Sequence, residues 1–201
     1  MPSDPPADTM MFLQSMHAVD NEPIYQHEVK VAALSYEIAL ILGESEAVAE
    51  EIKTAAGYHD IGRFVQDDVL HSKADPLNAQ EKEDLKNHCL DGARMLIKAG
   101  KKKDGSEAAV ALCHHERWDG SGYPAGLKGE EIPLAARIVA LADFYDALRS
   151  KRPYKAAIDH ERTMQILIDG DDRTSPDHFD PKILNAFVEQ QERLRQVWEA
   201  A

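Results

Sequence analysis

Residues 134–148, Leu-Ala-Ala-Arg-Ile-Val-Ala-Leu-Ala-Asp-Phe-Tyr-Asp-Ala-Leu, decide which fold this chain can adopt. The stretch is apolar on nearly every side, which is typical of a helix that neighbours bury on several faces. Asp143 lies in its middle. An ionised carboxylate that is buried without a partner costs several kcal/mol. The sequence therefore predicts a central helix with a positive group beside Asp143.

Apolar residues also recur at helical spacing within several other segments. Further helices are expected over residues 27–42, from about Ser45 onward, over 78–99 and over 106–116. Gly43 stands where a left-handed cap would end the first of them. No alternation of apolar and polar residues predicts a strand. The predicted fold class is all-α.

The length and charge of the chain limit its organisation and its partners. With 201 residues and 43% hydrophobic content, one compact domain is expected. Residues 1–9 contain three prolines and are expected to stay loose, which leaves 10–201 for the domain. A net charge of −13 argues against binding to a nucleic-acid polymer. A small anionic ligand is compatible with this charge, because bound cations invert the field inside one pocket.

Signals for membrane insertion or secretion are missing from the sequence. Only Cys89 and Cys113 are present, too few for a disulfide framework. We interpret both as small core residues. The sequence predicts a cytoplasmic protein that does not engage a membrane.

Nitrogen and oxygen donors gather at or beside the apolar helix faces. Alone, each inward histidine is interpreted as a hydrogen-bonded core residue. Together, seven donors from five helices are what two adjacent divalent or trivalent metal ions require. Imidazole suits iron, manganese or zinc, and the lack of a cysteine set argues against a structural zinc site. The seven donors are His27, His59, Asp60, His88, His114, His115 and Asp143.

Two strings of residues resemble a known family. Residues 58–63, Tyr-His-Asp-Ile-Gly-Arg, are similar to the HD signature of metal-dependent phosphohydrolases. Residues 114–124, His-His-Glu-Arg-Trp-Asp-Gly-Ser-Gly-Tyr-Pro, are similar to the HD-GYP extension. The similarity continues through 137–138, 142–143, 145–148, 152–155 and 179–181. The chain therefore resembles the HD-GYP domain family over about residues 10–190, which implies one helical HD-type domain with a glycine-rich GYP loop.

The resemblance implies a dinuclear metal centre with two sets of ligands. His27, His59, Asp60 and Asp143 would hold one ion, and Asp60, His88, His114 and His115 would hold the other. Iron is the expected metal and manganese the second choice. His59 and Asp60 are the expected catalytic pair. In such sites a water shared by the two metals is acidified to hydroxide and attacks phosphorus. The implied reaction is hydrolysis of cyclic di-GMP to the linear dinucleotide or to GMP, while some members act on related cyclic dinucleotides.

The resemblance also assigns residues around the substrate. Arg152 and Lys155 match phosphate-contacting positions, although they are simply exposed charges in the alternative interpretation. Tyr123 lies in the loop that faces the substrate or docks a signalling partner in the family. Trp118 and Tyr123 would either stack on guanine or anchor the loop. Glu116 is close enough in sequence to orient one ligand histidine through a hydrogen bond.

Two positions depart from the family pattern. Arg63 replaces a common lysine, and a guanidinium keeps the phosphate contact but cannot shuttle a proton. Pro23 stands where members with a third metal have glutamate, so we expect two ions and a linear dinucleotide product.

Two other functions remain open from the sequence. One is a degenerate module that binds a cyclic dinucleotide or a signalling protein without turnover, which Arg63 favours and the complete ligand set disfavours. The other is an HD phosphohydrolase for a different nucleotide, which the Gly-Tyr-Pro string disfavours.

Overall fold

A computed structural model describes residues 22–66, 78–151 and 156–201 of the chain. Within these ranges there are helices, turns and loops but no strand, which confirms the all-α prediction. The elements are α2 (Glu22–Ile41), α3 (Glu46–Ala56), the 3-10 helix η1 (Ile61–Val65), α5 (Ala79–Lys86), α6 (His88–Lys98), α7 (Ser106–Cys113), η2 (Gly129–Glu131), α8 (Leu134–Arg149), α9 (His160–Asp169), η3 (Pro176–His178), α10 (Pro181–Glu189) and α11 (Gln191–Ala200).

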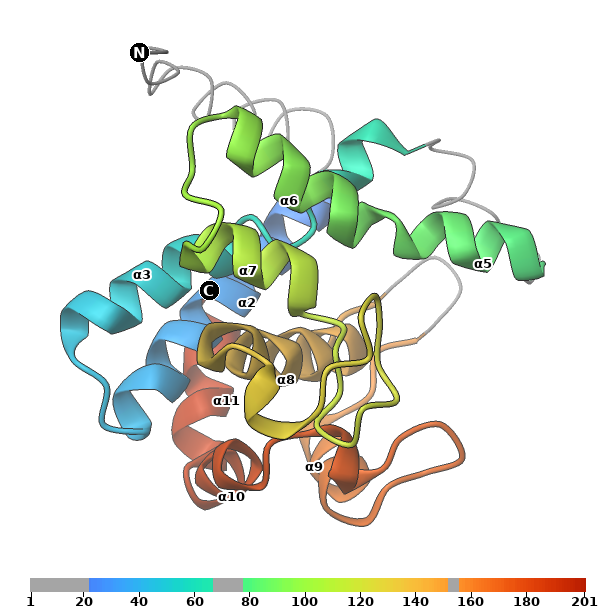
Figure 1. Ribbon diagram of the computed structural model, residues 1–201. Helices are drawn as coiled ribbons and strands as arrows, with labels where there is room; N and C mark the ends of the chain where they lie inside the picture. Colours follow the sequence, from blue (N-terminus) through green and yellow to red (C-terminus); the bar gives the residue numbers. More distant parts are fainter. Residues whose placement is uncertain (1–21, 67–77, 152–155) are drawn as a thin grey trace.

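Helix α8 is the central helix that the sequence predicts. It lies in the middle of the domain in Figure 1, with α6 and α7 on one side and α9 and α10 on the other. It contacts α2, α3, α7, α9 and α10. Ile138, Val139, Leu141 and Tyr145 are fully buried on it. Burial on several sides explains why its sequence is apolar nearly all round.

The chain turns sharply from α2 into α3 at Gly43. This glycine adopts a φ of 89°, the left-handed cap that its position predicts. The Gly43 and Glu44 N–H groups donate to the Leu40 and Ala39 carbonyls. The Ser45 side chain then accepts from the Val48 N–H and caps α3. Consequently α3 runs back along α2, and the His59–Asp60 turn that follows α3 lies in the core.

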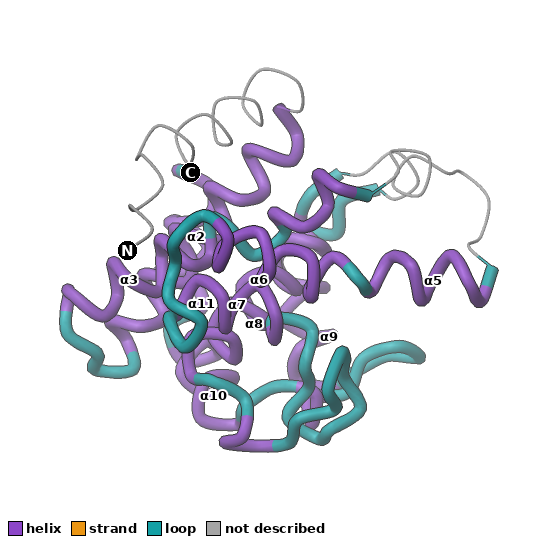
Figure 2. The backbone as a smooth tube through the Cα atoms, turned by 45° about the horizontal axis from the view of Figure 1, so that its top comes forward, coloured by secondary structure: helices purple, strands orange, loops and turns teal. Residues whose placement is uncertain are grey.

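The single helix expected over 78–99 is wrong, because it breaks at Asn87 into α5 and α6. The Leu85 carbonyl, which a continuous helix would use internally, accepts from the His88 ring and from the Gln66 amide. The Asn87 N–H donates to the Asp84 carbonyl, three residues earlier, whereas an α-helix would use the carbonyl four residues earlier. In Figures 1 and 2, α5 projects from the body of the domain. The helix expected over 106–116 also ends early, at Cys113.

Three C-terminal helices, α9, α10 and α11, are absent from the sequence prediction. Their signal is present, because Ile183, Leu184 and Phe187 repeat at helical spacing and all three are buried. Helices α10 and α11 pack on α2, and α9 and α10 pack on α8. They complete the core around the central helix.

Other expectations concern the surface and the chain ends. Cys89 and Cys113 are buried free cysteines, as expected. No helix in the described ranges combines the length and apolarity of a membrane span. The loose segment expected at 1–9, together with Arg152 and Lys155, lies outside the described residues.

Gly62 provides a test of the packing between η1 and α6. A Cβ at this position would overlap the His88 carbonyl oxygen and lie 2.6 Å from the Gly92 nitrogen. Gly62→Ala should therefore lower the free energy of unfolding by roughly 1–3 kcal/mol, because both obstacles are backbone atoms. Urea unfolding measures this change.

Gly57→Ala is the matched control. Gly57 has a helical φ of −64°, and a Cβ there would meet the Thr54 carbonyl oxygen at an ordinary 3.6 Å. This variant should be stabilised by roughly 0.4–1 kcal/mol. Equal stability of the two variants would show that η1 and α6 do not pack this closely.

Candidate metal centre

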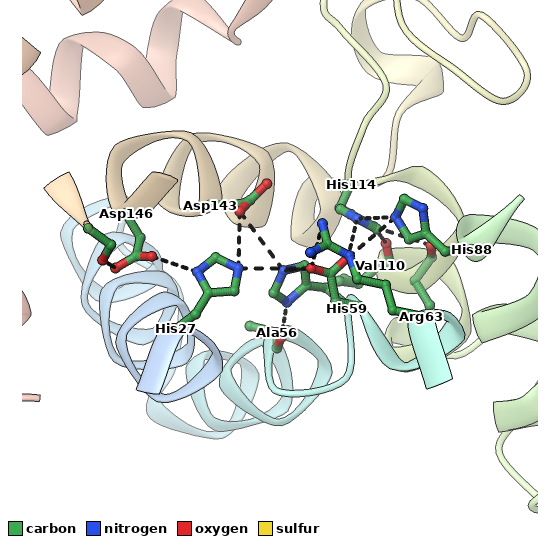
Figure 3. Close-up of polar contacts among 12 residues, drawn as sticks. His27, Ala56, His59, Arg63, His88, Val110, His114, Asp143 and Asp146 are labelled. Carbon is green, nitrogen blue, oxygen red and sulfur yellow. Dashed lines mark hydrogen bonds and ion pairs between the residues drawn. The ribbon is translucent and has the colours of Figure 1, made fainter. Parts of the chain in front are cut away.

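The turn after α3 places His59 and Asp60 in the interior. The His59 Nδ1 bonds the Ala56 carbonyl oxygen at 2.8 Å, across the end of the helix. His59 is fully buried, and Asp60 is 1% exposed. Close packing of Gly62 on the His88 backbone brings the start of α6 to the same place. Figure 3 shows His59 and His88 with His27, His114 and Asp143 around them.

The rings of His59, His88 and His114 are each oriented through the Nδ1 atom. The Nδ1 of His88 bonds the Leu85 carbonyl at 2.6 Å, and that of His114 bonds the Val110 carbonyl at 3.0 Å. Carbonyl oxygens only accept, so these Nδ1 atoms carry the proton. The Nε2 atoms are left with lone pairs that point toward Asp60.

The two oxygens of Asp60 face two different groups of histidines. Its Oδ1 lies 3.3 Å from His88 Nε2 and 3.6 Å from His114 Nε2. Its Oδ2 lies 3.4 Å from His59 Nε2 and 3.9 Å from His27 Nε2. We call the group His27, His59 and Asp60 site 1, and the group Asp60, His88, His114 and His115 site 2. Within each group the ligand atoms lie within 4.8 Å of one another.

Asp143 of α8 joins site 1 from the opposite side. Its Oδ1 lies 3.3 Å from His27 Nε2 and 4.0 Å from His59 Nε2. The positive group expected beside it is His27. Burial disfavours a charged His27, but its bonds to Asp143 and Asp146 outweigh burial and raise its pKa to about 10. In metal-free protein, a proton on His27 therefore partly compensates the two carboxylates.

His59, His88 and Asp60 have the charge states that metal binding needs. Burial lowers the pKa of His59 and of His88 to about 4, so both rings are neutral at pH 7. Burial would raise the pKa of Asp60, but the Arg63 guanidinium holds it well below its usual range. Neutral imidazoles and ionised carboxylates are the forms that coordinate metals.

Unsatisfied buried atoms show that the residues present fit metal ions. Among the described residues, His59 Nε2 and Asp60 Oδ1 are buried without a hydrogen bond, and Asp60 Oδ2 has an ion pair with Arg63 but no hydrogen bond. Leaving buried polar atoms without a hydrogen bond is costly, and cations would satisfy them. The donors are nitrogen and oxygen atoms, which suit iron, manganese or zinc. Cys89 adds no thiolate, because burial raises the pKa of its thiol.

The predicted substrate residues have different surroundings. Arg63 Nη2 lies 2.9 Å from Asp60 Oδ2, as an ion pair on the shared carboxylate. The Tyr123 ring lies 4.8 Å from the His115 ring, beside site 2. Trp118 anchors the loop, because its backbone N–H donates to the His178 carbonyl and its ring lies under the Arg137 guanidinium. Of the two aromatic residues, Tyr123 is the one that faces the site.

Glu116 does not orient a histidine in the way that its spacing predicts. Its carboxylate accepts from the Ala125 N–H at 2.7 Å and from the Leu127 N–H at 3.0 Å. Both donors belong to the glycine-rich loop. A carboxylate that follows His115 directly is well placed to tie down a loop that folds back over it. Glu116 therefore fixes the shape of the loop.

Asp146 is the residue that the sequence analysis missed. It is fully buried, and its Oδ2 lies 2.6 Å from His27 Nδ1. Its Oδ1 accepts from Trp198 Nε1 at 2.7 Å and from the Ser150 hydroxyl at 2.9 Å. A signal was available, because Asp146 is three residues after Asp143 and shares its helix face. Asp146 orients His27 as backbone carbonyls orient His59, His88 and His114.

Comparison with known proteins identifies relatives of this chain. The HD domain family model matches residues 12–183. A probable cyclic di-GMP phosphodiesterase of Vibrio cholerae is 43% identical over 72% of this chain and 33% of its own length. A cyclic di-GMP phosphodiesterase of Thermotoga maritima is 37% identical over 87% of this chain and 46% of its own length. A 3'3'-cGAMP-specific phosphodiesterase of Vibrio cholerae is 36% identical over 81% of this chain and 30% of its own length. The chain thus spans a third to a half of the relatives it matches.

A solved structure supports the fold. Bd1817, an HDG"Y"P protein from Bdellovibrio bacteriovorus, superposes with a TM-score of 0.67 and 20% identity. The match covers 92% of this chain and 60% of that chain.

Asp146→Asn tests whether Asp146 prepares His27 for a metal. The neutral amide should lower metal affinity at site 1 by about 10- to 100-fold, because the ring loses its charged partner. Titration of Mn²⁺ into metal-free protein should show one weakened step and one unchanged step. Ser150→Ala is the control, since it removes a contact from the other oxygen only. Two unchanged steps in Asp146→Asn would exclude this role.

The raised pKa of His27 predicts proton release on metal binding. At pH 7 the metal-free ring is protonated, since its pKa is about 10, and a metal must displace that proton. Affinity at site 1 should therefore rise about tenfold per pH unit between pH 7 and 9. Calorimetry in buffers of different ionisation enthalpy counts the protons.

A neighbouring carboxyl requires a control. Burial and the charge of Asp60 raise the pKa of Glu28 to about 8, so Glu28 would release a proton in the same range. In the Glu28→Gln variant, metal binding should still release the proton of His27. Binding without any proton release in this variant would refute a protonated His27.

Proposed function

We propose, on the premise that this chain belongs to the HD domain family and to its HD-GYP group, that it is a metal-dependent phosphodiesterase that hydrolyses cyclic di-GMP. The observation that carries the proposal is Asp60, whose two oxygens face site 1 and site 2. A buried carboxylate shared by two donor groups is suited to bridging two cations. The substrate is the one for which two of the relatives are named.

Two ions held at these sites would act as Lewis acids toward a phosphoryl group and lower the pKa of a nearby water. The residues of the chain prepare this chemistry. His59 and His88 are neutral and present Nε2, while Asp60 stays ionised beside Arg63. We assign two ions to the centre, with iron the first choice and manganese the second. This donor set accepts either metal.

The substrate side of the proposal rests on the loop and on charged residues. Tyr123 faces site 2, where a bound nucleotide would meet it. Arg152 and Lys155, which lie outside the described residues, are proposed to contact phosphate oxygens, as the family resemblance implies. Residues 124–126 of the loop are exposed and are our proposed contact for a signalling protein.

A second candidate substrate is 3'3'-cGAMP. It is favoured by the relative that is 36% identical and is named for that substrate. Both molecules contain guanine and the same type of phosphodiester, so both would present a scissile phosphate to the same centre. The complete donor set disfavours a module that only binds.

The test is turnover of cyclic di-GMP and 3'3'-cGAMP by protein purified without oxygen, with metals counted on the same sample. We expect about two ions per chain and metal-dependent hydrolysis. Asp60→Ala should lose both ions and turnover together, because Asp60 belongs to both sites. Asp104→Ala, at an exposed aspartate, is the control.

Two results would contradict the proposal. Full turnover in Asp60→Ala would exclude the shared carboxylate from the mechanism. Two bound ions without hydrolysis of either substrate would favour the binding module.

A further inference from the structure

Helix α11 contacts α2, the helix that carries His27, and its inner face reaches Asp146 of α8. Two side chains of this face are buried. Leu194 is fully buried, and Trp198 is 9% exposed. Trp198 lies outside residues 12–183, so the family match assigns it no role. Its contacts are the evidence for what it does.

Two cations hold the ring of Trp198 in place. Lys30 Nζ lies 4.0 Å from the ring centre, and the Arg149 guanidinium lies 4.6 Å from it. Lys30 is three residues after His27 on α2. Arg149 is three residues after Asp146 on α8. Residues three apart are neighbours on a helix surface, and a cation over an indole is favourable. Both helices of the His27–Asp146 pair therefore fix the ring beside it.

The indole N–H of Trp198 holds one oxygen of Asp146. Nε1 donates to Asp146 Oδ1 at 2.7 Å in the interior. The other oxygen, Oδ2, lies 2.6 Å from His27 Nδ1. Hydrogen bonds to an ionised carboxylate are stronger than those between neutral groups. The carboxylate cannot turn without losing a buried contact, which is costly. Trp198 therefore keeps Oδ2 directed at His27.

Ser150 shares this oxygen but is a weaker support. Its hydroxyl donates to Asp146 Oδ1 at 2.9 Å in a partly buried position. Water can take over a donor's place where solvent reaches it. The contact from Trp198 is buried, so its loss leaves Oδ1 short of a donor. Of the two donors, Trp198 is the one that determines the orientation of the carboxylate.

We propose that Trp198 is a positioning residue of site 1, which acts through Asp146 on the orientation of His27. The connected contacts keep His27 Nε2 directed into site 1, where it lies 3.3 Å from Asp143 Oδ1. Docking of α11 and metal binding at site 1 therefore depend on the same hydrogen bond. The inference rests on the metal centre of the proposed function, and it does not depend on which cyclic dinucleotide is cleaved.

The test is calorimetric titration of Mn²⁺ into metal-free protein, with turnover of cyclic di-GMP and 3'3'-cGAMP measured on the loaded protein. Trp198→Phe keeps an aromatic ring and removes the N–H. It should weaken one Mn²⁺ step about three- to tenfold, which is less than the roughly 10- to 100-fold effect of changing a direct partner of a ligand. The other step should not change, because no residue of site 2 contacts Trp198 or Asp146.

A double variant shows whether Trp198 acts through Asp146. In an Asp146→Ala background the indole N–H has no carboxylate to hold. Adding Trp198→Phe to this background should therefore cause no further loss of Mn²⁺ affinity, since the two changes remove parts of one interaction. A role of Trp198 in packing alone would add its own loss.

Leu194→Val is the matched control on the same helix. Valine leaves a space in the core, as phenylalanine does at position 198, while the Trp198 N–H stays in place. The melting temperature of this variant should fall, and both Mn²⁺ steps should match those of the wild type.

The outcomes separate this inference from the proposed function. Unchanged steps in Trp198→Phe, equal losses in Trp198→Phe and Leu194→Val, or additive losses in the double variant would overturn the role of Trp198, whether or not the protein turns over. A selective, non-additive loss without hydrolysis of either substrate would retain that role and overturn the phosphodiesterase. Wild-type protein that binds no Mn²⁺ would overturn both.

Discussion

The carboxylate of Asp60 is buried to 1% exposure, and neither of its oxygens has a hydrogen bond among the described residues. An ionised group in this position is strongly destabilising unless cations compensate it. Arg63 compensates one side, and the histidines of sites 1 and 2 surround the rest. The folded domain therefore depends on positive charge at this point, which Arg63 and a protonated His27 supply in the metal-free protein and which bound metal ions would increase.

The ligand histidines are oriented by two kinds of hydrogen-bond acceptor. Backbone carbonyls at the ends of α3, α5 and α7 orient His59, His88 and His114. These contacts are local and follow from the way each helix ends. His27 instead depends on Asp146, which also binds Trp198 of α11. The C-terminal helix therefore supports site 1 through Asp146, while His88 and His114 of site 2 depend on the local ends of α5 and α7.

The break at Asn87 connects the end of a helix to the orientation of a histidine. The Leu85 carbonyl leaves the helical pattern and bonds His88 Nδ1, and α5 ends there. Lys86, the last residue of α5, lies over the Tyr123 ring of the glycine-rich loop. One backbone interaction thus orients His88 and ends the helix that contacts this loop.

The sequence by itself determined the helical class and the central helix, and it predicted the donor residues, because helical periodicity and the His-Asp and His-His strings are local properties. It also indicated the family, which the comparisons confirm. The tertiary structure decided which oxygen of Asp60 faces which histidines, that Glu116 holds the loop, and that Asp146 holds His27 from 119 residues away. Spacing along a chain does not specify such contacts, because they arise only when separate helices pack and each buried polar atom must find a partner.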